Sequence, residues 1–203
     1  VPRESGFDIT AASELMAVMG LATDEDDLRR RIDAIIVGVG SSGEPIRIRD
    51  LKITGSVMAI LRDAILPNLV QTTEGTPALV HGGPFANIAH GCSSVLGDRA
   101  ALARADYVVT EAGFGFDLGG EKFFDLKVPV LGVAPSAVVI VASVRALDLH
   151  GAGNVKEGLS NLAAHLDSVA HTGVTPVVAI NRMDGDSDTD LALIRSFCEE
   201  RGV

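Results

Sequence analysis

The sequence predicts an α/β fold: a mostly parallel, doubly wound sheet with helices on both faces, and a β-hairpin near residues 34–49. Runs rich in Val and Ile alternate with segments in which apolar residues recur at helical spacing, so strands and helices should alternate along the chain. The strongest apolar run, residues 137–142, is not interrupted by polar residues. Such a run is typical of a central parallel strand that is buried on both faces.

The individual elements follow from these two patterns, the Val- and Ile-rich runs for strands and the helical spacing of apolar residues for helices. Strands are expected at residues 34–39, 46–49, 78–80, 107–110, 137–142 and 176–180. Helices are expected over most of the first 33 residues, at 57–65, at 87–103, around 155–169 and after the N-cap residue Ser187. A capping signal, Thr23-x-x-Asp26, falls within the first helical region, and a long glycine-rich loop is expected at residues 111–122.

Composition and charge exclude several classes of protein. The 203-residue chain has a formal net charge of −10, which argues against a basic nucleic-acid-binding face and against binding to anionic lipid. It contains no apolar run of the roughly 20 residues that a membrane span needs. Its two cysteines, Cys92 and Cys198, lack metal-ligand spacing and suggest reduced thiols in a cytoplasmic protein. We therefore expect small-molecule ligands, with no nucleic-acid or membrane partner and no metal ligands.

The chain is expected to form a single α/β domain over residues 1–203. Its length suits one sizeable core, and no flexible linker or internal repeat divides it. The start, Val1-Pro2-Arg3-Glu4, has no signal-peptide character, and both ends are abrupt. These features suggest a piece of a longer protein.

Ligands of open α/β sheets bind beyond the carboxyl ends of the parallel strands. The first such place is the turn from His81 to His90, which begins His81-Gly82-Gly83-Pro84. Its glycines and the helix expected behind them could present N–H groups to an anion or substrate. The alternative is a tight strand-to-helix turn in which His81 bonds to the backbone, and the local pattern does not decide between the two.

The second place is the loop at residues 111–122. It contains Gly113, Gly115, Gly119 and Gly120, charged residues at Glu111, Asp117, Glu121 and Lys122, and aromatic rings at Phe114 and Phe116. Its spacing is not the dinucleotide-binding fingerprint. The charges could still lie near a ligand and the rings could pack a flat heterocycle, although the two Phe side chains could instead anchor a mobile loop to the core.

The third place is Asn181-Arg182-Met183-Asp184, directly after a predicted buried strand. Its spacing is similar to the base-reading Asn-Lys-x-Asp element of GTP-binding proteins, but four residues are also readily explained as an ordinary turn. The chain has no G-x-x-x-x-G-K-[ST] sequence to hold nucleotide phosphates and no G-x-S-x-G nucleophile elbow.

Long stretches of the chain resemble formate–tetrahydrofolate ligase (formyltetrahydrofolate synthetase), and they follow that family's order across nearly the whole chain. The stretches are residues 3–14, 68–72, 75–92 (GTPALVHGGPFANIAHGC), 106–127 (DYVVTEAGFGFDLGGEKFFDLK) and 141–147 (VASVRAL).

The resemblance implies an ATP-dependent ligase that joins formate to N10 of tetrahydrofolate through formyl phosphate, with MgATP and tetrahydrofolate as substrates. It also implies a homo-oligomer, and it places this chain in the central portion of the enzyme. The family's P-loop segment, with its lysine, lies upstream, and a folate-binding segment lies downstream. Without them this span should bind neither substrate tightly and should be inactive alone, and its own catalytic residues stay unknown.

Carried over by position, the resemblance puts His81, Gly113, Phe114, Gly115, Asp117 and Glu121 on the formyl and folate side of the cleft. It puts Asn181, Arg182 and Met183 at the nucleotide and folate end. The sequence departs from the family at Met183, where a Phe is usual, and at Asp148, where a Lys is usual. These departures leave open a second hypothesis, a non-catalytic, ligase-derived module that binds folate or a partner protein.

Overall fold

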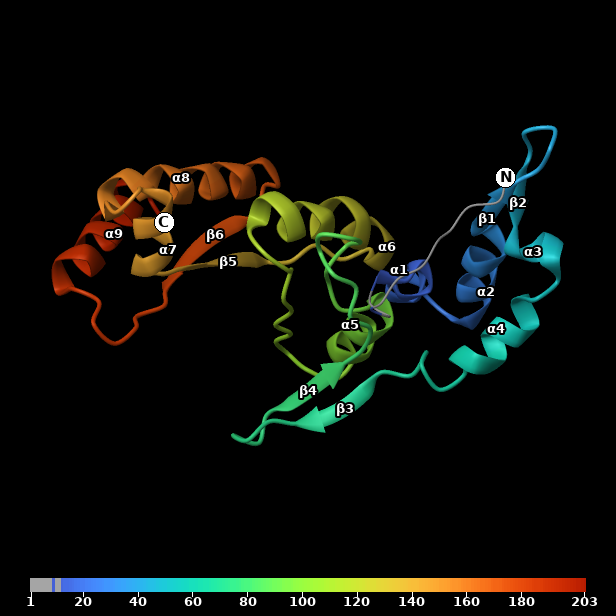
Figure 1. The fold of residues 1–203 in the computed structure, drawn as a ribbon. Coiled ribbons are helices and arrows are strands. Elements are labelled where there is room, and N and C mark those ends of the chain that lie inside the picture. The colour runs from blue at the N-terminus through green and yellow to red at the C-terminus, as the bar shows by residue number, and fades with distance from the viewer. Residues whose placement is uncertain (1–8, 10–11) are drawn as a thin grey trace. The chain divides into compact units, whose positions relative to one another are not determined.

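The computed structural model describes residue 9 and residues 12–203, and it confirms the α/β class. The chain forms two compact units (Figure 1). Unit 1 contains the described residues up to Phe114, together with Leu118–Val133, and unit 2 contains Gly115–Asp117 and Ala134–Val203. The expectation that residues 1–203 make a single domain stays a prediction.

Unit 1 begins with helices, as expected. The helices are α1 (Glu14–Leu21), α2 (Glu25–Ala34), α3 (Ile48–Leu51) and α4 (Thr54–Leu61). Leu28 and Ile32 of α2 are completely buried in the core that these helices share. The N-cap of α2 is Asp24 rather than the expected Thr23, because the Asp24 carboxylate accepts the N–H of Asp27. Residues 1–8, 10 and 11 of the expected helical region lie outside the described residues.

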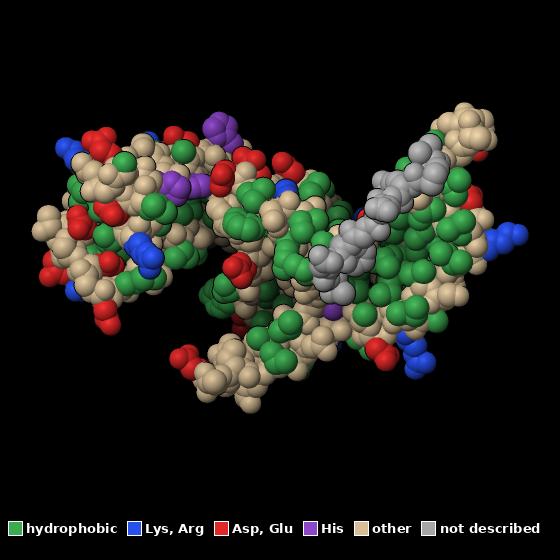
Figure 2. Space-filling model, in the orientation of Figure 1, with side chains coloured by type: hydrophobic (Ala, Val, Ile, Leu, Met, Phe, Trp, Pro, Cys, Tyr) green, Lys and Arg blue, Asp and Glu red, His purple; other side chains and the backbone are tan. Residues whose placement is uncertain are grey.

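Two antiparallel hairpins follow the helical N-terminal part. The expected hairpin near residues 34–49 is confirmed as β1 (Ile36–Val39) paired with β2 (Pro45–Arg47). The second strand ends at Arg47 rather than at residue 49 because α3 begins at the next residue. A second hairpin pairs β3 (Asn68–Gln71), which the sequence pattern did not reveal, with β4 (Pro77–Val80). Figure 2 shows hydrophobic side chains gathered at the surface over the first hairpin and α2.

Three expectations between residues 87 and 131 were wrong in detail. The helix expected at 87–103 begins only at α5 (Val95–Leu102), after Gly91 turns the chain at a φ of +66° and Ser94 caps the helix. The expected strand at 107–110 is absent, and Tyr107 and Val109 are more than 90% exposed. The second half of the expected 111–122 loop is helical. This helical segment continues through η2 (Phe116–Gly120), η3 (Phe123–Lys127) and α6 (Val128–Leu131).

Unit 2 is a parallel strand pair with helices, close to expectation. Strand β5 (Ala137–Ala142) pairs in parallel with β6 (Thr175–Ile180). The helices are α7 (Val144–His150), α8 (Val155–His171) and α9 (Asp188–Glu200). The predicted N-cap Ser187 and the helix stop at Gly173, with a φ of +74°, are both confirmed.

Sheet size and burial are where the structure differs most from expectation. The strands of the described residues form three separate two-stranded sheets, of which only β5–β6 is parallel. Burial along β5 alternates, so this strand is covered on one face rather than on both. Val139, Val141 and Val177 are 58%, 67% and 47% exposed on the strand pair. Among the residues that the structure describes, no helix has both the length and the apolar character to cross a membrane.

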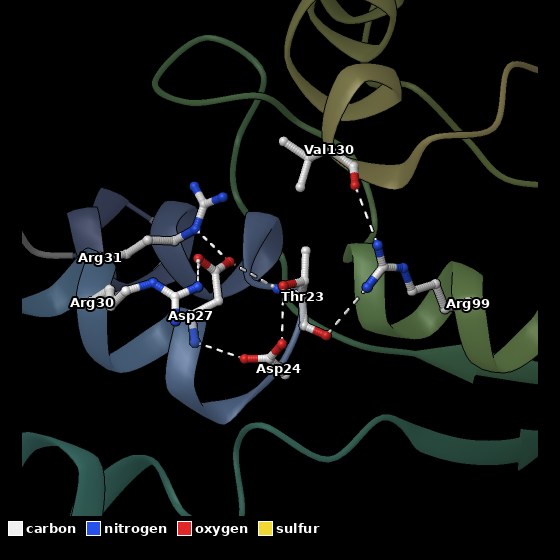
Figure 3. Close-up of polar contacts among 7 residues, drawn as sticks. All are labelled: Thr23, Asp24, Asp27, Arg30, Arg31, Arg99 and Val130. Carbon is white, nitrogen blue, oxygen red and sulfur yellow. Dashed lines mark hydrogen bonds and ion pairs between the residues drawn. The ribbon is translucent and has the colours of Figure 1, made fainter.

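The N-terminus of α2 is held by a polar network around Asp27 (Figure 3). The Asp27 carboxylate accepts the Thr23 N–H at 3.1 Å and pairs with Arg31 at 2.8 Å and Arg30 at 3.1 Å. Burial alone would raise the pKa of Asp27, but the hydrogen bonds from Arg31 and Thr23 and the charges of both arginines outweigh it and lower the pKa below its ordinary 3.8. Arg99 links the same turn to α6 by donating to the carbonyls of Thr23 and Val130.

We expect Asp27→Asn to lower the free energy of unfolding by about 1 kcal/mol at neutral pH, because it removes a partly buried charge from its partners. A depressed carboxyl pKa stabilises the fold above the unfolded pKa, and this stability is lost as the pH falls through the folded pKa. The difference between parent and variant should therefore shrink below pH 3.8. Urea denaturation across this range measures it, with Asp63→Asn, a 96% exposed side chain, as the neutral control.

Candidate functional site

The chain turns sharply after β4, and this turn, residues 81–91, contributes many of the residues of the candidate site in unit 1. Gly82 adopts a φ of +70° and Gly91 a φ of +66°, and residues with a Cβ rarely adopt such positive values. Between them, the N–H groups of Ile88 and Ala89 both donate to the Phe85 carbonyl, at 3.1 and 2.7 Å. The segment from 84 to 90 is therefore a compact turn rather than the first turns of a helix.

His81 is buried beneath this turn, and both of its ring nitrogens are paired within the protein. Nε2 donates to the Ala64 carbonyl at 2.8 Å, and Nδ1 lies 2.5 Å from the Ser94 hydroxyl oxygen. Ser94 also accepts the N–H of Gly97 and caps α5. His81 is only 4% exposed, so it joins the end of β4 to the turn that follows α4 and to the start of α5, and it contributes to the site by holding the turn in place.

Three glycines let two distant segments approach closely beside this turn. The Gly113 N–H donates to the Gly91 carbonyl at 3.0 Å, next to a bridge between Cys92 and Ala112. A Cβ added to Gly91 would lie 2.2 Å from the Ala86 Cβ, and one added to Gly119 would lie 1.7 Å from the Gly113 carbonyl oxygen. Glycine is required at these positions because the backbones occupy the space of a side chain.

This crossing opens a largely apolar pocket of about 450 Å³. Phe114, 74% exposed at a φ of +63°, stands on one side of it, and Phe85, 43% exposed, lies among the residues of the turn. No charged side chain lines the pocket, so its chemistry suits a flat, uncharged ring. The lining residues are Pro84, Phe85, Ala86, Asn87, Gly91, Gly113 and Phe114.

A second pocket of about 260 Å³ adjoins the first, and the two share Pro84 and Gly91. It is lined by the His81–Pro84 turn, by residues 91–93 and by Glu111, which brings a carboxylate to its edge. Cys92 also lines it, but burial raises the pKa of the Cys92 thiol to about 11, so the thiol is a poor nucleophile.

Glu121 and Lys122, which follow Gly119 on the helical segment, have different surroundings. Glu121 is exposed. Lys122 is half-buried, and its ammonium group donates to the carbonyls of Ala86 and Ala89. The charge of Lys122 is therefore directed at the backbone of the turn.

The remaining predicted site residues belong to unit 2. Asp117 lies 3.9 Å from Nδ1 of His165 on α8, and a Cβ added to Gly115 would lie 3.0 Å from the same ring. The sequence suggested a solvated surface position for His165, whose side chain is only 20% exposed, because its partner Asp117 lies far away in the chain. Among the described residues, no group of three or more His, Cys, Asp or Glu side chains is arranged to hold a metal ion.

Asn181, Arg182 and Met183 follow β6 at its carboxyl end. The Asn181 N–H donates to the Ala142 carbonyl at the end of β5, which extends the parallel ladder by one bond of 2.7 Å. Arg182 pairs with Asp188 at 3.2 Å. Met183 is 47% exposed, and its N–H is accepted by the Asp186 carboxylate at 2.8 Å.

Comparison with known proteins decides the family. A family model described as formate–tetrahydrofolate ligase matches residues 1–203. This chain belongs to the formate–tetrahydrofolate ligase family. Curated ligases of that name are similar to it over its whole length: it is 53% identical to those of Granulibacter bethesdensis and Hyphomonas neptunium, and 50% identical to that of Lactiplantibacillus plantarum.

The chain spans 37–39% of the length of these curated ligases. Of the predicted site residues, Gly113 and Phe114 line one pocket, and His81 lines the neighbouring pocket. Phe85, Asn87 and Gly91 also line these pockets. Phe85 and Asn87 lie within the His81–His90 turn that the sequence pointed to, although it did not single them out, and Gly91 lies just beyond that turn.

Gly119→Ala tests the close crossing. We expect this substitution to lower the free energy of unfolding by about 1–3 kcal/mol, because the new methyl group would overlap the Gly113 carbonyl and force the two segments apart. Chemical denaturation measures the loss. Gly55→Ala in α4 is the matched control, since a Cβ there meets nothing within 4 Å, and equal effects of the two changes would contradict the packing argument.

Proposed function

We propose that the polypeptide carrying this span joins formate to N10 of tetrahydrofolate at the expense of MgATP, and that the span supplies the folate-side wall of the site. The observation that carries the proposal is the uncharged pocket that Phe85 and Phe114 line, in a chain of the ligase family. The pocket offers a flat ring an aromatic surface and offers a phosphate no positive charge.

The chemistry divides into two displacements. A formate oxygen attacks the γ-phosphorus of ATP and ADP leaves, which gives formyl phosphate. N10 of tetrahydrofolate then attacks the formyl carbon, and phosphate leaves while the amine loses its proton. This span would hold the pteridine ring against Phe114 and keep water away from it, while the phosphates would be bound by a part of the ligase outside this sequence.

Several features support the view that the span works only as part of the longer chain. It has no phosphate-binding loop sequence, and it covers less than two fifths of the length of its curated relatives. The exposed valine face of β5–β6 would be covered by another layer in a complete sheet of this kind. A homo-oligomeric, cytoplasmic enzyme remains part of the proposal on the family resemblance alone.

Formate labelled with ¹⁸O tests the proposed reaction in the complete ligase polypeptide. If formate is activated by phosphorylation, one labelled oxygen passes from formate to each phosphate released, and mass spectrometry of the phosphate detects it. Transfer of the label together with formate-dependent ADP release supports the proposal. Folate binding without ADP release would instead favour the non-catalytic module, consistent with Met183 at the position where the family usually has a ring.

Phe114→Ala tests the pocket directly. Removing the ring should raise the KM for tetrahydrofolate by about 3- to 10-fold, since one aromatic contact contributes about 1 kcal/mol, and should leave the KM for ATP nearly unchanged. Steady-state kinetics with each substrate varied in turn gives the comparison. Tyr107→Ala, which removes a 92% exposed ring outside the pocket, is the control. A rise in the KM for ATP alone would place the pocket on the nucleotide side.

A further inference from the structure

Lys122 connects the helical segment that follows Gly119 to a turn more than thirty residues earlier. Its ammonium group donates to the carbonyl of Ala86 and, at 2.8 Å, to the carbonyl of Ala89. Hydrogen bonds from a charged donor are roughly twice as strong as neutral ones, and these two hold both ends of the Ala86–Ala89 segment. Phe85, a wall of the apolar pocket, directly precedes that segment.

The same helical segment also contacts the backbone beside the second ring of the pocket. Gly119, less than one helical turn before Lys122, packs against the backbone of Gly113, so closely that a Cβ there would lie 1.7 Å from the Gly113 carbonyl oxygen. Gly113 is followed by Phe114, which lines the pocket together with Phe85. One rigid segment therefore contacts the backbone next to both aromatic rings.

We infer that Lys122 is a positioning residue for the ring-binding pocket: it sets the separation of Phe85 and Phe114 by clamping the carbonyls of Ala86 and Ala89. Its charge serves the protein backbone and does not meet a ligand anion. The inference rests on the proposed function, since it assigns the pocket to the pteridine ring of tetrahydrofolate. It differs from the role expected from the sequence, in which the Lys122 charge lay near a ligand.

Steady-state kinetics of Lys122→Met in the complete ligase tests the inference. Methionine keeps the length and apolar stem but donates no hydrogen bond, so the turn should loosen and the KM for tetrahydrofolate should rise about tenfold. The KM values for ATP and formate should change less than about twofold, because no charge is removed from their sites. Lys122→Arg keeps the charge and the donors and should recover most of the loss.

A double-mutant cycle separates positioning from general damage. If Lys122 acts through Phe85, the effect of Lys122→Met on the KM for tetrahydrofolate should disappear when Phe85 is already Ala. Lys156→Met, an exposed lysine on α8, is the matched control and should change nothing. Hydrogen exchange at the amides of Ile88 and Ala89 should be faster in Lys122→Met than in the parent, whereas exchange at the amides of β5 should be unchanged. This measurement does not depend on whether the enzyme turns over.

Different outcomes of these experiments would overturn the proposed function and the inference about Lys122. An inactive parent enzyme with faster exchange in Lys122→Met would overturn the proposed function and leave the clamp supported. An active parent in which Lys122→Met raises all three KM values equally, or in which its effect adds to that of Phe85→Ala, would overturn the inference. If Lys122→Met does not fold, a Lys122→Arg variant that fails to keep the KM for tetrahydrofolate within about threefold of the parent would overturn it as well.

Discussion

The candidate site depends on one constraint, the approach of two backbone segments at Gly91, Gly113 and Gly119. At this crossing the Gly113 N–H donates to the Gly91 carbonyl, while a Cβ at Gly91 would overlap Ala86 in its own turn and one at Gly119 would overlap the Gly113 backbone. A side chain at Gly91 would distort its own turn against Ala86, one at Gly119 would displace the Gly113 backbone, and in either case the pocket beside Phe114 would lose its shape. Tightly packed segments transmit small displacements rather than absorbing them, so a methyl group added at the crossing would shift the Phe85 and Phe114 rings of the pocket.

Polar groups buried near this crossing reinforce it. Lys127 is completely buried, lies 2.7 Å from the Asp98 carboxylate on α5 and sits over the Phe123 ring. Burial, together with the charges of Lys127 and Lys122, lowers the pKa of His90 to about 4, so its ring is neutral at physiological pH. Burying an ion pair gives little net stability, but breaking one is costly, so these groups favour a single arrangement of α5 and the helical segment.

Local sequence predicted the elements whose stability is local. The apolar run of β5, the face of α8 from Val155 to Val169 and the Ser187 cap all appear where expected, because period and capping are properties of the segment itself. The helical course of residues 116–131 was not predictable in this way. Its glycines favour a loop, and the contacts that outweigh them come from Gly113 and Ala86. The same reasoning selected Phe114 and Gly113 for the site but could not place Phe85 in the same pocket with them.

The strands of unit 2 show a different limit. Their uninterrupted apolar sequence predicted two buried faces, whereas α7, α8 and α9 bury only one, and Val139 and Val141 on the other remain more than half exposed. An uninterrupted apolar sequence is compatible with one exposed face if the composition of a strand is set by every contact it makes in the complete protein. An isolated parallel pair is an unusual structure, because parallel strands are normally buried within larger sheets. The apolar character of β5 and β6 therefore indicates that the face of the pair left bare within unit 2 is suited to packing against a further layer.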